Sequence, residues 1–171
     1  MNKQYSHDVK NIPGKTVTLK PGTDFALGPL EVNVIFTEQA PTAAALACAR
    51  SLARDLGARI HLLFAVEVPF QLPLERPGVS VSFLQEQLSK VLGDLEKDGF
   101  EPRANLYLCR DPVRALQQAL KPNSLVLIGG RKRWWPTPES GIARALRAKG
   151  HRVICVDSKA PAVLEPAMIS R

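Results

Sequence analysis

Cysteine is scarce in this chain of 171 residues, which has three: Cys48, Cys109 and Cys155. They are far apart, and each stands among apolar residues. An odd, scattered set of cysteines argues against a disulfide framework and is typical of small core residues with reduced thiols. We therefore expect the protein to occupy a reducing compartment, the cytoplasm.

Histidine is equally scarce, and none of the three histidines has a cysteine or an acid at metal-ligand spacing. We therefore expect no metal site. Neither a Ser-His-Asp nor a Cys-His arrangement has local support, and Ser140 stands in ESG, which is not the G-x-S-x-G turn of a hydrolase. The sequence thus predicts a protein that is not an enzyme, or that hydrolyses ATP slowly at most.

Long hydrophobic runs are absent as well. No apolar stretch approaches the roughly 18 residues that a membrane helix requires, although 45% of the residues are hydrophobic. The N-terminal MNKQYSHDVKNIPGK contains no apolar segment of the kind that a secretory signal needs. Both absences favour a globular cytoplasmic protein without a membrane partner.

The chain divides into three parts. Residues 1–30 are polar, carry several glycines and show little periodicity, so we interpret them as a partly ordered arm in which TVTL, at 16–19, is a candidate edge strand. Residues 31–157 alternate between apolar β-rich runs and helical patterns, and predict one α/β domain. Residues 158–171 are interpreted as a loosely ordered C-terminal tail.

Five apolar runs in the central domain have the composition of β-strands. They are VNVIF at 32–36, RIHLLFAVEV at 59–68, ANLYLC at 104–109, SLVLIGG at 124–130 and RVICVD at 152–157. Continuous apolar character indicates burial on both faces, as in a parallel sheet. We expect one residue from each run in the interior of the sheet: Val34, Leu63, Leu106, Leu127 and Ile154.

Helical patterns separate these runs. Residues 41–57 predict a helix with a proline in its first turn and a glycine at its C-terminal stop. Apolar spacing predicts a second helix over 83–95, Asp111-Pro112 starts a third, and 142–149 form the last. Strict β-α alternation with short connections predicts a doubly wound parallel sheet with right-handed crossovers.

Positive charge is concentrated between residues 131 and 152. Seven basic residues and one acid leave this stretch with +6 of the chain's net +7. Three of these cations, Arg131, Lys132 and Arg133, are candidates for binding an anion. The tryptophans at 134 and 135 offer rings on which the bases of a nucleic acid could stack. The alternative is a solvated loop whose tryptophans pack against the domain or a partner. Because no nucleic-acid recognition motif is visible, we do not expect a sequence-specific reader.

The order of three segments in the central domain is characteristic of a known protein family. The segments are VNVIFTEQAPTAAALACARSLARDLGARIHLLFAVEVP, then CRDPVRALQQAL, then LVLIGG followed by ALRAKGHRVICV. Together they resemble the first β-α-β unit, the short helix start and the closing unit of the universal stress protein family, over residues 31–157. The resemblance implies a five-stranded sheet of order 3-2-1-4-5 and a homodimer formed through the fifth strand, Arg152 to Asp157.

Nucleotide-binding members of that family carry an acid at the tip of the first strand, where it contacts the adenosine part of the ligand. In register, this position is Thr37, which has no carboxylate. The neighbouring Glu38 would take the place of the acid only after a one-residue slip; otherwise it is an exposed loop residue. The resemblance therefore implies a weakened adenosine site.

The same members carry G-x2-G-x9-G-[ST] after the fourth strand, where backbone N–H groups and a hydroxyl hold phosphates. Here Gly130 matches the first glycine, and Arg133 replaces the second. Glu139 replaces the third glycine, Ser140 supplies the hydroxyl, and the loop is shorter than in the motif. Because glycines let the backbone approach a phosphate closely, these departures predict that ATP binds weakly or not at all.

The leading hypothesis is a cytoplasmic, homodimeric binding or regulatory module without family-type ATP binding or catalysis, whose further partner is a protein or a small anion. If the pocket binds a ligand, we expect an anion held by Gly130 and the cations at 131–133, near the start of the following helix. The main alternative is a nucleotide-binding stress protein that holds ATP or AMP in a degenerate pocket: Thr37, Glu38, Gly129, Gly130 and Ser140. The third is nonspecific nucleic-acid binding with strong salt dependence.

Overall fold

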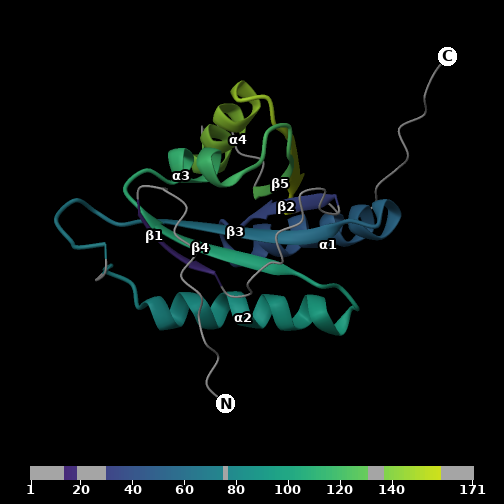
Figure 1. The fold of residues 1–171 in the computed structure, drawn as a ribbon, viewed down its shortest axis with the longest axis horizontal. Helices are drawn as coiled ribbons and strands as arrows, with labels where there is room; N and C mark the ends of the chain where they lie inside the picture. The colour runs from purple at the N-terminus through teal and green to yellow at the C-terminus, as the bar shows by residue number, and fades with distance from the viewer. Residues whose placement is uncertain (1–13, 19–29, 75–76, 131–136, 159–171) are drawn as a thin grey trace.

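The computed structural model describes residues 14–18, 30–74, 77–130 and 137–158, and Figure 1 shows their arrangement. Strands and helices alternate along most of this length. In chain order the elements are β1 (Gly14–Thr18), β2 (Glu31–Ile35), α1 (Gln39–Leu56), β3 (Arg59–Glu67), α2 (Val81–Lys97), β4 (Arg103–Cys109), α3 (Pro112–Ala119), β5 (Leu125–Gly130), α4 (Pro138–Ala148) and β6 (Arg152–Asp157).

The strands form one sheet in the order β1-β4-β3-β2-β5-β6. The five strands from β2 to β6 are parallel, and their order is the predicted 3-2-1-4-5. The predicted fold class is therefore confirmed. A sixth strand, β1, pairs antiparallel with β4, from Gly14 opposite Cys109 to Thr18 opposite Asn105. The N-terminal segment considered as an edge strand thus supplies one, whereas β6 ends the sheet on the other side.

Two layers of helices enclose the sheet. The core on one face is formed with α1 and α2, and the core on the other face with α3 and α4. Neighbouring strand residues alternate between these faces, so that Val34 belongs to the first core and Ile35 to the second. Within the described residues, no helix is long and apolar enough to cross a membrane.

Four of the five residues expected in the sheet interior are fully buried: Val34, Leu63, Leu106 and Leu127. The expectation for Ile154 was wrong, because this side chain is 38% exposed. Among the described strands, β6 has a sheet neighbour only on the side of β5, and it is largely exposed along its length. The apolar run predicted the strand and the strand order implied by the resemblance predicted its edge position, but neither predicted the exposure of Ile154.

Local sequence signals account for the helix boundaries. Gly57 ends α1 in a left-handed conformation with φ of 59°, which glycine adopts without steric cost. The Asp111 carboxylate accepts a hydrogen bond from the Arg114 N–H and starts α3 as predicted. The last helix, α4, begins at Pro138, four residues before the predicted start, because Thr137 caps it.

Candidate functional site

The carboxyl ends of β2 and β5 lie side by side in the middle of the sheet, where Ile35 pairs with Ile128. After β2 the chain turns to α1 on one face, and after β5 it reaches α4 on the other. Ligands of open α/β sheets bind at such a switch point. The structure brings Thr37, Glu38 and Gly129 together here, with Gly130 next to the start of α4. Residues 131–133 lie outside the described residues.

Thr37 ties the end of β2 to its neighbours. Its hydroxyl donates to the carbonyl oxygen of Gly129 at 3.2 Å, and its N–H donates to the hydroxyl of Thr42 at 3.1 Å. Both polar groups therefore have partners within the protein. Thr37, at the position where nucleotide-binding family members carry an acid, therefore links β2 to β5 and to the first turn of α1.

Gly129 allows α1 to approach β5 closely. A Cβ added there would lie 1.8 Å from the carbonyl oxygen of Pro41, so no larger residue fits without moving one of the two elements. Gly130 is different, because a Cβ there would meet its nearest neighbour, the Cβ of Glu139, at 3.9 Å. The need for glycine at 129 thus has a packing cause that is independent of any ligand.

Ser140 takes part in the cap at the start of α4. Its N–H donates to the Thr137 hydroxyl at 3.3 Å, and its own hydroxyl accepts from the Thr137 N–H at 3.1 Å. The Ser140 hydroxyl also lies 2.7 Å from the Thr137 carbonyl oxygen, to which it donates. The side chain predicted to hold phosphate forms a reciprocal cap instead, which satisfies N–H groups that an anion would use.

A pocket of about 250 Å³ lies between the ends of β5 and β6 and the start of α4. We call it the β5–α4 pocket; its lining is Ile128, Gly130, Thr137, Glu139, Ser140, Cys155, Val156 and Asp157. Two carboxylates, Glu139 and Asp157, belong to this wall, and Glu139 stands in the first turn of α4. A carboxylate at a helix N-terminus interacts favourably with the helix dipole, as an anionic ligand would. The described part of the wall is therefore a poor match to a phosphate.

The sequence prediction missed the contribution of β6 to this pocket. Cys155 and Asp157 lie on its wall, yet neither was a candidate. The alternation of side chains along RVICVD contains the signal, because Cys155 is paired in register with Ile128 and faces the same side of the sheet.

A second pocket, of about 240 Å³, lies beside α2 on the other face of the sheet. Its lining is Phe36, Gln39, Phe83, Glu86, Gln87, Lys90 and Val91. The Phe36 ring packs against the Phe64 ring with centroids 4.4 Å apart, so the end of β2 carries an aromatic wall. Glu38, in the same loop, occupies the N-cap position of α1. Its side chain is exposed and makes no capping hydrogen bond.

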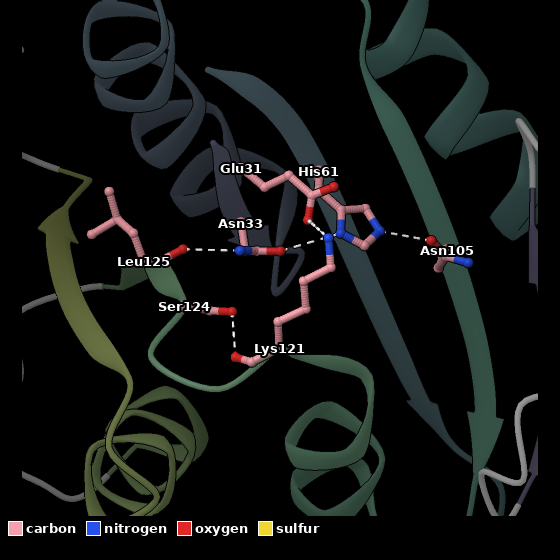
Figure 2. A network of polar contacts seen from close by, with 7 residues as sticks. All are labelled: Glu31, Asn33, His61, Asn105, Lys121, Ser124 and Leu125. Carbon is pink, nitrogen blue, oxygen red and sulfur yellow. Dashed lines mark hydrogen bonds and ion pairs between the residues drawn. The ribbon is translucent and has the colours of Figure 1, made fainter. Parts of the chain in front are cut away.

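A row of polar side chains crosses the sheet at the opposite, amino ends of the strands (Figure 2). The His61 ring on β3 lies between Asn33 on β2, with Nδ1 3.2 Å from the amide oxygen, and Asn105 on β4, with Nε2 2.7 Å from the amide oxygen. The Asn33 amide in turn donates to the Leu125 carbonyl at 3.1 Å. Burial lowers the pKa of His61, and the hydrogen bond to Asn105 opposes this shift.

An ion pair flanks this row. Lys121, between α3 and β5, lies 3.3 Å from the Glu31 carboxylate at the start of β2. The Glu31 charge raises the pKa of His61, whereas Lys121 and Arg103 lower it. In the part of the chain that the structure describes, no group of three or more His, Cys, Asp or Glu residues could hold a metal ion. The row therefore links three strands through hydrogen bonds that centre on the partly buried His61 ring, whose pKa is lowered by burial.

Comparison with solved structures identifies proteins with a similar fold. A universal stress protein from Archaeoglobus fulgidus has a TM-score of 0.56 at 17% identity, covering 75% of this chain and 93% of that chain. The structure of the universal stress protein from the same organism in complex with dAMP gives 0.51 at 18%, covering 75% and 98%. A protein of the universal stress protein family from Burkholderia pseudomallei gives 0.53 at 21%, covering 74% and 94%.

No family model matches the sequence, and no curated protein matches it. At identities of 17 to 21%, the likeness to solved structures concerns the fold. The chain has the universal stress protein fold, as the sequence resemblance predicted.

Proposed function

We propose that this protein is a cytoplasmic, homodimeric binding or regulatory module with the universal stress protein fold, without ATP binding of the family type and without catalysis. One observation carries the proposal: the hydroxyls of Thr37 and Ser140 already form hydrogen bonds with backbone groups of the protein. Thr37 bonds to the Gly129 carbonyl, and Ser140 bonds to Thr137. Free cysteines at 48, 109 and 155 fit a reducing compartment.

The charge on the phosphate side supports the same proposal. Glu139 stands in the first turn of α4, next to Gly130, where a bound phosphate would need unoccupied N–H groups and no negative neighbour. A phosphate there would meet like-charge repulsion, which is strongest at low ionic strength. The cations at 131–133 would offset part of this repulsion, so the proposal predicts weak binding and not a strict absence.

Titration calorimetry with Mg-ATP and with dAMP tests the proposal. We expect no dissociation constant at or below about 10 μM, which corresponds to roughly −7 kcal/mol. Mass spectrometry of the protein purified under native conditions provides the control, since a nucleotide that stays bound through purification would mask the titration. A co-purifying adenine nucleotide, or a tighter constant, would contradict the proposal.

A nucleotide-binding function is the second candidate, and one observation favours it. Glu38 lies beside Thr37 at the switch point, is exposed and makes no capping hydrogen bond, so its carboxylate can contact a ligand. One of the compared structures is that of a universal stress protein in complex with dAMP. If the wild type binds nucleotide and Glu38→Gln weakens the binding at least about tenfold, this second candidate replaces the first. Glu86→Gln, in the lining of the second pocket beside α2, is the matched control.

The homodimer is proposed to form through β6. This strand ends the sheet, and it exposes Ile154 and Cys155 on a short apolar edge. An exposed apolar edge strand is a template for pairing with another strand, and a second copy of the same edge gives a symmetric pair. The opposite end of the sheet differs, because β1 covers β4 there.

A further inference from the structure

Arg147, in the last turn of α4, reaches the outer edge of β6. Its guanidinium donates to the carbonyl oxygen of Val153 at 3.0 Å and to the thiol of Cys155 at 3.3 Å. Both contacts are on the solvent-exposed side of the protein. A long cationic side chain therefore lies on the strand through which self-association is proposed.

The carbonyl that Arg147 occupies belongs to the free edge of the sheet. The N–H of Arg152 donates to the Ser124 carbonyl beside β5 at 2.9 Å, so this residue directs its N–H toward the sheet. Successive residues of a strand direct their backbone groups to alternate sides. The groups of Val153 and Cys155 consequently point away from β5, toward the place where a partner strand would lie.

We infer that Arg147 guards this edge: its guanidinium takes the hydrogen bond at the Val153 carbonyl that a partner strand would make, and a second chain pairs with β6 only after Arg147 leaves. The inference rests on the proposed homodimer and adds its regulation. Charged side chains are a common means by which proteins blunt an edge strand.

Two physical effects contribute to the guard. The first is direct competition, because the Val153 carbonyl cannot accept at the same position from the Arg147 guanidinium and from a backbone N–H of the partner. The second is repulsion, because a symmetric pair brings two Arg147 side chains to one interface, and like charges across paired strands are destabilising. Repulsion falls with added salt, whereas competition for the carbonyl does not.

Sedimentation velocity over a range of concentrations, in a reducing agent that prevents Cys155 disulfides, measures this effect. The variants are Arg147→Ala and Arg144→Ala, which each remove one exposed charge from α4; Arg147 is the one whose hydrogen bonds to β6 the structure describes. One net hydrogen bond corresponds to about fivefold in affinity, so Arg147→Ala should tighten the symmetric dimer about 25-fold. Arg144→Ala should change it less than about threefold, and thermal unfolding verifies that both variants fold.

The outcomes separate the guard from the dimer. A dimer in the wild type that Arg147→Ala leaves unchanged or weakens would keep the proposed assembly and overturn the guard. Equal tightening by Arg147→Ala and Arg144→Ala would assign the effect to net charge and also overturn it. If neither the wild type nor Arg147→Ala self-associates at about 100 μM, both the dimer and the guard are wrong. Tightening specific to Arg147→Ala, retained in high salt, supports the guard.

Discussion

At the scale of single residues, the contact between Gly129 and Pro41 fixes how closely α1 packs on the sheet. A methyl group at 129 would lie 1.8 Å from the Pro41 carbonyl oxygen, and backbone cannot rotate away as a side chain can. Gly129→Ala should therefore lower the free energy of unfolding by about 3 kcal/mol, measured by urea denaturation. The neighbouring Gly130→Ala has room, with its nearest contact at 3.9 Å, and should change stability by less than about 0.5 kcal/mol. Equal effects of the two substitutions would refute the packing explanation.

His61 makes the stability depend on pH. Burial lowers its pKa in the folded protein below the value near 6.5 that the unfolded chain retains. Between the two pKa values the unfolded state binds more protons, so stability rises with pH there. The contribution is fully present above about pH 6.5 and is lost as the pH falls through the lower folded value.

Urea denaturation between pH 5 and pH 8 tests this sign. The wild type should lose stability toward low pH more steeply than His61→Gln, whose amide keeps hydrogen-bonding capacity between Asn33 and Asn105 but does not titrate. The difference between the two curves isolates His61 from the other titrating groups. Parallel curves, or a steeper loss in the variant, would show that His61 is not the source.

At the scale of elements, α4 depends on its reciprocal cap. Thr137→Ala removes the hydroxyl that accepts from the Ser140 N–H and should cost about 1 kcal/mol, measured by chemical denaturation. Thr137→Ser keeps the hydroxyl and should cost less than half as much. A loss of similar size in both variants would point to the threonine methyl group and not to the cap.

The sequence predicted most elements because their causes are local. Continuous apolar runs gave the five parallel strands, and Asp111 followed by proline gave the start of α3. The start of α4 was misplaced because helical periodicity begins at Ile142, whereas the cap lies five residues earlier at Thr137. The exposure of Ile154 could not be predicted from composition, because an edge strand and a central strand can have the same apolar run.

The candidate site was less predictable because its contacts join distant segments. The register of the resemblance identified Thr37 and Ser140 as site positions, but not that each has a partner inside the protein. The approach of Pro41 to Gly129 and the contribution of Cys155 to the β5–α4 pocket arise when strands pair. Such contacts depend on strand order and register, which the sequence expresses only indirectly.

At the scale of the whole molecule, the two ends of the sheet differ in what they offer a partner. On one side β1 pairs with β4; on the other, β6 exposes Ile154 between a basic residue, Arg152, and the thiol of Cys155. The exposed cation Arg147 of α4 reaches this edge. Assembly through β6 would thus bring like charges together, which predicts a dimer that strengthens as salt screens them.

Ile154→Lys tests whether β6 is the assembly surface. A lysine on an edge strand opposes strand pairing, so the variant should be monomeric by light scattering at concentrations where the wild type is a dimer. The side chain is already 38% exposed, so thermal stability should fall by only a few degrees. Leu56→Lys is the control, because Leu56 is also an exposed apolar residue, 49% exposed, and belongs to the end of α1 and not to β6. Dimers of Ile154→Lys as stable as those of the wild type, or equal loss in both variants, would exclude β6 as the interface and direct the search to another face.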